Sequence, residues 1–256
     1  MMRRTPEAPG VTDVTRVQAR DTLKLSRLPS GEPEIFRSLQ GEGATAGAPT
    51  VFLRLAMCNL ACTWCDTKYT WDWQSYDVKR EVVSVGVADA IDRVEAFDCQ
   101  HLVITGGEPL MQQDALAPLV AQLSGRGFYC EVETNGTLAP GAELARAVSQ
   151  WNVSPKLANS GNAADRRTVP SALEAFRGLP NAYFKFVLVD PADADEVCGI
   201  VERFGLPRDR VILMPEGVTP DAVSTRGKWV ADLCERHGFR FSTRLHILLW
   251  GDERGR

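Results

Sequence analysis

Short apolar runs alternate with amphipathic segments along most of this chain. The apolar runs predict strands at residues 50–57, 101–105, 128–133, 151–154, 182–189, 210–214 and 240–245. The amphipathic segments predict helices at residues 85–97, 114–123, 142–149, 193–204 and 220–237. Strands that alternate with helices favour βαβ units and a mainly parallel sheet. We therefore expect an α/β fold whose functional loops follow the carboxyl ends of the strands.

The domain organisation is expected to be simple. Residues 1–22 mix Pro, Gly, Thr and charged residues without a hydrophobic period, which predicts a poorly ordered tail. From residue 23 onward, no low-complexity linker and no repeat of 20–50 residues divides the chain. A single domain over residues 23–256 follows.

Composition and charge exclude several classes of partner. The chain has 256 residues, 44% of them hydrophobic and 24% charged, as in ordinary globular proteins. Its net charge of -4 provides no basic field for nucleic acid, so a small-molecule substrate is expected. No apolar run approaches the roughly 18 residues of a membrane span, and no apolar segment follows Arg3 and Arg4 as in a secretory signal. We expect a cytoplasmic protein without a membrane partner.

Three of the seven cysteines, Cys58, Cys62 and Cys65, crowd into one short segment with the spacing C-x3-C-x2-C. Three thiolates from one loop can hold three irons of a [4Fe–4S] cluster and leave the fourth iron open to an exogenous ligand. Structural zinc is the alternative, but it needs a fourth Cys or His, and the remaining candidates are isolated in the sequence. The other cysteines are interpreted as small buried hydrophobes: Cys99, Cys130, Cys198 and Cys234.

With Trp64 before the last cysteine, the triad resembles the motif of the radical S-adenosylmethionine (SAM) superfamily. The resemblance implies a partial (β/α)6 barrel and places Trp64 beside the adenine of SAM, although a large aromatic residue could simply fill the core. Gly106-Gly107-Glu108-Pro109 resembles the superfamily's GGEP motif, in which Gly107 and Glu108 would contact the SAM amino group. Three further strand ends are expected to face SAM: residues 133–136, then Ser154, Pro155 and Lys156, and finally Met214, Pro215, Glu216 and Gly217.

Two of these polar loops could also be structural segments that bind no ligand. Residues 133–136 and 154–156 could be a turn and a polar loop without a ligand. The glycines at residues 41–47 do not form a dinucleotide fingerprint, because that motif follows a strand and opens a helix, whereas these residues precede a predicted strand.

A narrower resemblance rests on the decapeptide EIFRSLQGEG at residues 34–43, on Cys65-Asp66-Thr67 and on Arg244-Leu245-His246. Together these segments resemble the 7-carboxy-7-deazaguanine synthase family. The resemblance implies a carbon–nitrogen lyase that converts 6-carboxy-5,6,7,8-tetrahydropterin into 7-carboxy-7-deazaguanine with loss of ammonia, for queuosine or deazapurine biosynthesis. A 5′-deoxyadenosyl radical would abstract a hydrogen, SAM would be regenerated, and Mg²⁺ would assist the rearrangement.

The family motif also implies substrate and metal residues. Thr67 matches the magnesium position, although it could instead close a local turn. The residues implied for the pterin are Leu39, Gln40, Gly41, Arg54 and Thr105, together with Glu42 for its guanidine-like edge and His246 from the last predicted strand. An inward guanidinium of Arg54 would match a carboxylate, but strand parity alone leaves its direction open, and a surface arginine is the alternative.

The resemblance further implies a flavodoxin or ferredoxin as reductant and a homodimer. Two features depart from the family pattern: the N-terminal segment is longer than usual, and the family's C-terminal carboxylate contact cannot be placed on residues 251–256.

Two other functions stay open. One is another radical SAM reaction, on a small heterocycle or as a glycyl-radical activase. The other is a zinc-stabilised interaction module without enzymatic activity.

Overall fold

The computed structural model describes residues 21–256. Residues 1–20 of the predicted tail lie outside the described residues, and Thr22 opens the first strand.

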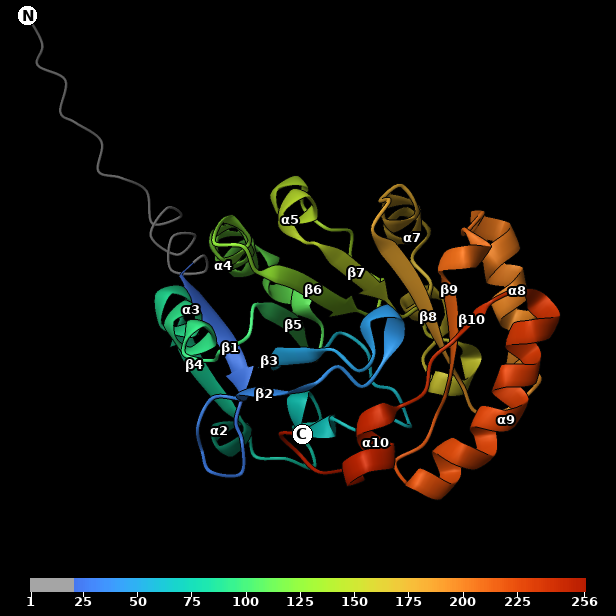
Figure 1. Cartoon of the computed structure of the whole chain (residues 1–256), viewed down its shortest axis with the longest axis horizontal. Coiled ribbons are helices and arrows are strands. Elements are labelled where there is room, and N and C mark those ends of the chain that lie inside the picture. The colour runs from blue at the N-terminus through green and yellow to red at the C-terminus, as the bar shows by residue number, and fades with distance from the viewer. Residues whose placement is uncertain (1–20) are drawn as a thin grey trace, which may run out of the picture.

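Ten strands of this described part form one sheet. They are β1 (Thr22–Ser26), β2 (Ile35–Leu39), β3 (Pro49–Leu55), β4 (Val82–Gly86), β5 (His101–Gly106), β6 (Tyr129–Thr134), β7 (Gln150–Val153), β8 (Ala182–Leu188), β9 (Val211–Pro215) and β10 (Arg240–Phe241). Their order is β10-β9-β8-β7-β6-β5-β3-β1-β4, and β2 pairs with β3. Pairing is parallel from β3 through β5 to β10 and antiparallel for β1, β2 and β4. The sheet is curved and open, so the predicted α/β fold with a mainly parallel sheet and a partial barrel is confirmed (Figure 1).

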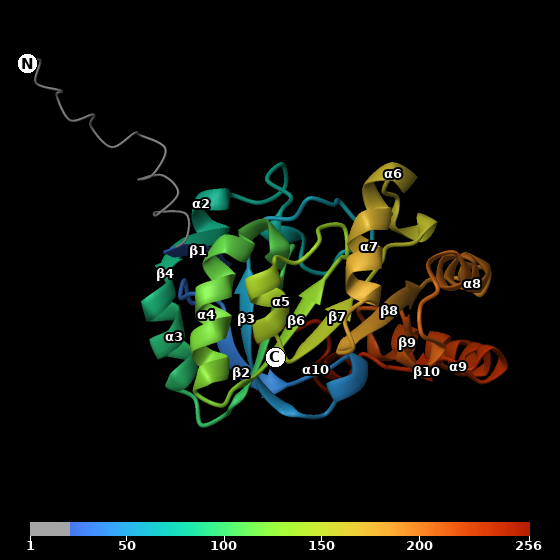
Figure 2. The same ribbon diagram turned by 90° about the horizontal axis from the view of Figure 1, so that it is seen from above.

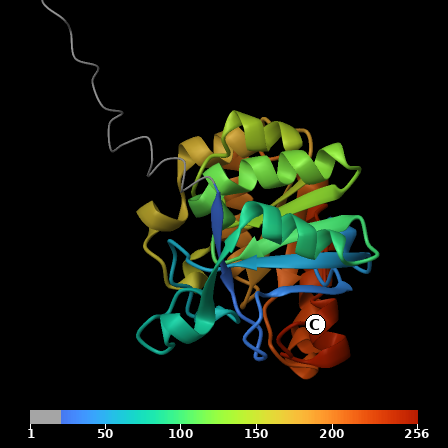
Figure 3. The ribbon, with the colours of Figure 1, turned by 90° about the vertical axis from the view of Figure 1, so that its left-hand side faces the viewer.

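The α-helices of residues 21–256 are α2 (Val78–Glu81), α3 (Val87–Glu95), α4 (Gln113–Gly125), α5 (Ala142–Ala147), α6 (Ala164–Arg167), α7 (Pro170–Arg177), α8 (Asp193–Phe204), α9 (Pro220–His237) and α10 (Leu245–Trp250). Helices α3, α4, α5, α7, α8 and α9 follow the outer face of the sheet (Figures 1 and 2). Helix α10 lies on the opposite, inner side, below β2 and β3 in Figure 3. No helix in this range combines the length and the apolar character that a bilayer crossing requires.

Alternation along each strand separates the core from the inner face. Leu53 and Leu55 of β3 are wholly buried under the outer helices, whereas Phe52 and Arg54 of the same strand line a cavity on the inner face. Strands β6 and β8 show the same alternation, and their charged residues face the inner side of the sheet. The inward polar residues of the parallel strands are Thr105, Glu131, Glu133, Asn152 and Lys185.

Several predicted elements match closely, including α8 and α9 at residues 193–204 and 220–237. The helix predicted at residues 85–97 was wrong at its start, because Val85 belongs to β4, which pairs antiparallel with β1. The strand predicted at residues 240–245 was too long. It ends at Phe241, and His246 lies on α10 rather than on a strand.

Candidate active site

A cavity of about 220 Å³ lies at the carboxyl ends of the parallel strands, and His246 of α10 belongs to its lining. Most residues predicted for ligands and substrate line it: Leu39, Gln40, Gly41, Glu42, Arg54, Cys58, Cys62, Trp64, Cys65, Thr67, Thr105, Gly107, Ser154, Lys156, Met214, Glu216 and His246. Four predicted residues are not part of its lining: Glu108, Pro155, Pro215 and Gly217. The structure thus brings residues from distant segments, the first at residue 39 and the last at residue 246, to the lining of one cavity.

The cysteine loop follows β3 and is held by close backbone approaches. Met57 begins the loop with a φ of 77°, a left-handed conformation that is uncommon outside glycine. A methyl group on Gly107 would overlap the carbonyl of Met57, and one on Gly106 would overlap the backbone of Leu55. These glycines therefore let the cysteine loop and β3 approach β5, in addition to the ligand approach expected from the sequence.

Two of the three cysteine sulfurs accept hydrogen bonds from side-chain N–H groups. Asn162 Nδ2 lies 3.3 Å from Cys62 Sγ, and Trp71 Nε1 lies 3.3 Å from Cys65 Sγ. Burial raises the pKa of the Cys58 thiol to about 12, so a bound metal centre is needed to hold it as a thiolate at neutral pH. The donors and the shared cavity fit a thiolate-held cluster.

The structural-zinc alternative has no preformed set of ligands in residues 21–256. There, no three His, Cys, Asp or Glu side chains lie close enough together to hold a single metal ion. A single zinc ion requires four such ligands at bonding distance.

The indole of Trp64 is half-buried in the cavity wall and does not fill the core. Its Nε1 donates to the backbone oxygen of Asn159 at 3.1 Å. Lys156 Nζ lies 5.6 Å from the ring centroid and donates to Ser154 Oγ at 2.8 Å. Trp64, Ser154 and Lys156 therefore form one polar and aromatic patch beside the cysteine loop.

The Glu108 side chain, expected at the SAM amino group, is engaged elsewhere. It is wholly buried, and its carboxylate accepts hydrogen bonds from Leu110 N at 3.0 Å, Thr134 Oγ1 at 2.7 Å and Asn135 N at 2.7 Å. Asn135 in turn donates to Asn59 Oδ1 at 2.8 Å. Residues 133–136 are therefore more than a turn, because they tie the GGEP segment to the cysteine loop.

Gln40 is held by two inward carboxylates. Its Nε2 donates to Glu131 Oε1 at 2.9 Å and to Glu133 Oε1 at 3.3 Å, and its Oε1 accepts from Glu42 N at 3.2 Å. Thr105 Oγ1 donates to the other oxygen of Glu133 at 2.7 Å. These bonds order the loop after β2 against β5 and β6.

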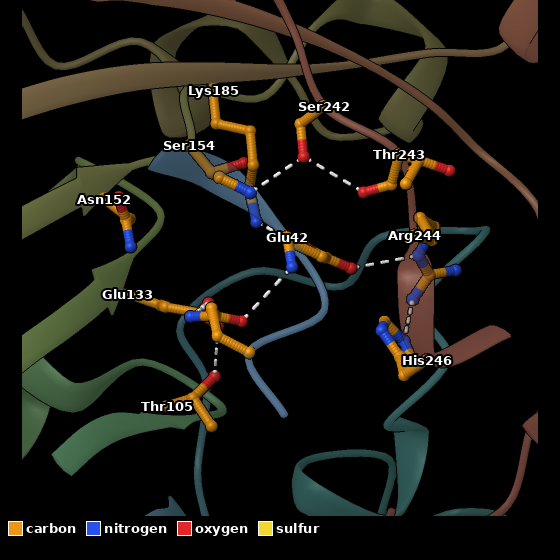
Figure 4. A network of polar contacts seen from close by, with 12 residues as sticks. Glu42, Thr105, Glu133, Asn152, Ser154, Lys185, Ser242, Thr243, Arg244 and His246 are labelled. Atoms are coloured by element: carbon orange, nitrogen blue, oxygen red, sulfur yellow. Dashed lines mark hydrogen bonds and ion pairs between the residues drawn. The ribbon is translucent and has the colours of Figure 1, made fainter. Parts of the chain in front are cut away.

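Glu42 lies between two cations (Figure 4). Its carboxylate is paired with Lys185 Nζ and accepts from Arg244 Nε at 3.0 Å. Although burial opposes ionisation, Lys185 and Arg244 hold the pKa of Glu42 well below its usual range. The side chain is therefore an anion at neutral pH, able to accept N–H donors of a ligand.

Sequence reasoning gave no role to Lys185, Arg244, Asp66 or Glu131, and it included Glu133 only as part of the loop at residues 133–136. Arg244 joins Glu42 to Asp66, the residue after Cys65, and also donates to the carbonyl of Gly217 at 2.6 Å. A signal was present for Lys185, since it is the one charge in the apolar strand Ala182–Leu188. Arg244 stood beside His246 in a quoted motif but without a role.

The direction of Arg54, left open by the sequence, is toward the cavity. Its side chain is 18% exposed, and its Nε donates to Glu34 Oε1 at 2.8 Å. The surface-arginine alternative is therefore wrong.

Thr67 does close a local turn, since its carbonyl accepts from Thr70 N at 2.9 Å. Its hydroxyl takes no part in that turn and lies 3.6 Å from Cys65 Sγ at the cavity wall. The neighbouring carboxylate of Asp66 is paired with Arg244. A magnesium ion here would thus take one hydroxyl from Thr67 and would need further oxygens from water or substrate, as Mg²⁺ sites commonly do.

Comparison with known proteins agrees with this arrangement. Residues 54–158 match the family model of the Radical SAM superfamily. A 7-carboxy-7-deazaguanine synthase of Pyrobaculum aerophilum is 41% identical over 226 residues, covering 87% of this chain and 96% of that protein. One of Halobacterium salinarum is 36% identical over 241 residues, covering 86% and 90%. The crystal structure of QueE from Escherichia coli is similar, with a TM-score of 0.64 and 25% identity over 88% of this chain and 95% of that chain.

Proposed function

Because the chain belongs to the 7-carboxy-7-deazaguanine synthase family of radical SAM enzymes, we propose that it converts 6-carboxy-5,6,7,8-tetrahydropterin into 7-carboxy-7-deazaguanine with loss of ammonia. One observation carries the proposal beyond family membership. A single cavity joins the three cysteines to the guanidinium of Arg54 and the anionic carboxylate of Glu42. A pterin carboxylate would find a cation, and the N–H groups of a pterin guanidine edge would find an anionic acceptor, in the same space.

The residues around the cysteine loop suit SAM and a [4Fe–4S] cluster. Cys58, Cys62 and Cys65 would hold the cluster, and SAM on its open iron would supply the radical that abstracts a hydrogen from the substrate. The cavity residues that would hold SAM are Trp64, Gly107, Ser154, Lys156, Met214 and Glu216. In this assignment Glu108 acts indirectly, because its carboxylate holds Thr134 and Asn135, which line the cavity.

The opposite wall suits the pterin. Arg54 would bind the carboxylate through its terminal nitrogens, and Glu42 would accept N–H groups of the guanidine edge. Thr105 and Gln40, both bonded to Glu133, would line the space between them. These contacts fix the orientation of the substrate relative to the cysteine loop, which is what a selective hydrogen abstraction requires.

Thr67 is proposed as the protein ligand of Mg²⁺, supported by a hydroxyl at the cavity wall that the local turn does not use. A flavodoxin or ferredoxin reductant, a homodimer and a cytoplasmic location stay predictions from the sequence.

The decisive experiment is anaerobic incubation of cluster-loaded protein with SAM, a reductant, Mg²⁺ and the carboxypterin. The deazaguanine chromophore should appear in wild-type protein and be absent in Cys62→Ala. SAM cleavage without the chromophore would favour another radical SAM reaction, and zinc without iron or sulfide would favour the interaction module.

A further inference from the structure

Glu34 is a wholly buried carboxylate behind the cavity wall. Its backbone is fixed on both sides: its N–H donates to Ser26 O at 2.7 Å, and its carbonyl accepts from Arg54 N at 3.0 Å. Burying an isolated carboxylate is unfavourable, so such a group requires well-placed partners.

Three donors hold the Glu34 carboxylate. Oε1 accepts from Arg54 Nε at 2.8 Å and from the Tyr69 hydroxyl at 3.0 Å, while Oε2 accepts from Arg254 Nε at 3.2 Å. The guanidinium of Arg254 also lies over the ring of Tyr69, with its central carbon 3.5 Å from the centroid, and pairs with Glu81 at 2.9 Å. The carboxylate plane is thus set from both of its oxygens.

This arrangement uses only one nitrogen of Arg54. Among residues 21–256, no acceptor forms a hydrogen bond with its two terminal nitrogens, and the exposed part of the side chain belongs to the cavity wall. Because the guanidinium is planar, fixing Nε fixes the plane in which the terminal nitrogens can grip a carboxylate.

We propose that Glu34, braced by Arg254 and Tyr69, is a positioning residue that holds Arg54 with its terminal nitrogens toward the cavity and so makes the site selective for a carboxylated ligand. The inference rests on the proposed function and deepens it. A buried ion network is weak evidence for stability, since apolar side chains of similar volume often replace one at no cost, whereas it can specify a single geometry.

Orientation and charge give opposite expectations for Glu34→Gln. If Glu34 mainly neutralises Arg54, removing its charge should strengthen binding of an anion. If Glu34 mainly orients Arg54, binding of an anion should weaken. The three partners of the Glu34 carboxylate are all donors, and a glutamine at this position would turn its own N–H₂ group toward at least one of them.

The test measures anaerobic binding to cluster-loaded protein with SAM present, using 6-carboxy-5,6,7,8-tetrahydropterin and 5,6,7,8-tetrahydropterin, which lacks the carboxylate. We expect Glu34→Gln to weaken carboxypterin binding about tenfold and to leave tetrahydropterin and SAM binding unchanged. Glu95→Gln is the matched control, since Glu95 pairs with Arg126 at 2.7 Å on the surface. It should change neither affinity.

Unchanged or tighter carboxypterin binding in Glu34→Gln would overturn the inference, and so would an equal loss for both pterins, which would indicate a structural role. Should Glu34→Gln fail to fold, Arg254→Lys keeps the buried charges balanced but loosens the carboxylate plane, and it should show the same selective loss to a smaller degree. A wild-type protein that binds both pterins equally would instead overturn the proposed function, on which the inference rests.

Discussion

The imidazole of His246 packs against the α-carbon of Gly41 so closely that a methyl group on Gly41 would overlap its Nδ1 atom. The backbone strengthens this contact, since Leu245 N donates to Gly41 O at 2.8 Å. The loop after β2 and helix α10 therefore meet at one point of the cavity wall, and glycine is required there for space rather than for an unusual φ.

Gly41→Ala should displace His246 and lower carboxypterin turnover by on the order of 10- to 100-fold, because small misplacements in an active site are costly. SAM cleavage without pterin should persist. Gly199→Ala is the control, as nothing lies within 4 Å of the added methyl group in α8. The double variant Gly41→Ala/His246→Ala should be no slower than His246→Ala alone, and additive losses would show that the two residues act independently.

Each of Cys58→Ala, Cys62→Ala and Cys65→Ala should abolish formation of 5′-deoxyadenosine, since each removes one of three proposed cluster ligands. Cys99→Ala should retain the activity, because Cys99 donates to backbone oxygens away from the cavity. Normal 5′-deoxyadenosine formation by Cys62→Ala under anaerobic reduction would refute the assignment of the triad.

Trp71→Phe removes the N–H group that lies 3.3 Å from Cys65 Sγ but keeps an aromatic ring. Hydrogen bonds to cluster sulfurs stabilise the reduced, more negative state, so the midpoint potential should become more negative. A redox titration followed by electron paramagnetic resonance measures this. Trp73→Phe serves as the control, since Trp73 is exposed and bonds to no cysteine of residues 21–256. Equal potentials in wild type and Trp71→Phe would contradict the prediction.

Thr67→Ala should leave uncoupled SAM cleavage largely intact while lowering pterin turnover and weakening its response to added Mg²⁺. The hydroxyl that the variant removes makes no bond within the turn, so the backbone should keep its conformation. Turnover assays over a range of Mg²⁺ concentrations measure the effect. Wild-type magnesium dependence in Thr67→Ala would remove this residue from the site.

Burial lowers the pKa of His246 below its ordinary value of 6.5, so the folded protein favours the neutral ring. The unfolded chain then binds more protons than the folded one below pH 6.5, and stability should fall as the pH drops from 6.5 toward the lowered pKa. The free energy of unfolding measured in urea should depend less on pH in His246→Gln than in wild type. An identical pH dependence would show that His246 titrates normally.

The parallel strands that carry the site could be predicted because each is a local apolar run ended by a polar loop, as with β5 before Gly106 and Gly107. The cysteine triad could be predicted for the same reason, since its three residues lie within one short segment. The antiparallel β2, which leads into the loop at Gln40, was not predicted. Strand β4 was not predicted either, because residues 82–86 extend only by pairing with β1, about 60 residues earlier in the chain, as in Lys24 with Ser84.

The polar network was harder to predict for a similar reason. Lys185 stands out as the one charge of an apolar strand, but Glu42 and Arg244 are ordinary single charges, and the network forms only when three distant segments meet. Gly107 and Glu108 also make contacts that the motif did not predict, because Gly107 approaches the backbone of Met57 and the Glu108 carboxylate accepts from Asn135 N.

The ion pairs that close the cavity also bear on how the chain reaches this state. Arg244 meets Glu42 across 202 residues, and Arg254 meets Glu34 across 220. Contacts of such sequence separation require the closure entropy of a long loop before they contribute, so they form slowly compared with hairpins and helices. During synthesis, Arg54 follows Glu34 by 20 residues and Lys185 follows Glu42 by 143, but Arg254 and Arg244 leave the ribosome much later. Until then each carboxylate lacks one of its cationic partners, and the substrate wall of the cavity is completed only when residues 244–254 dock.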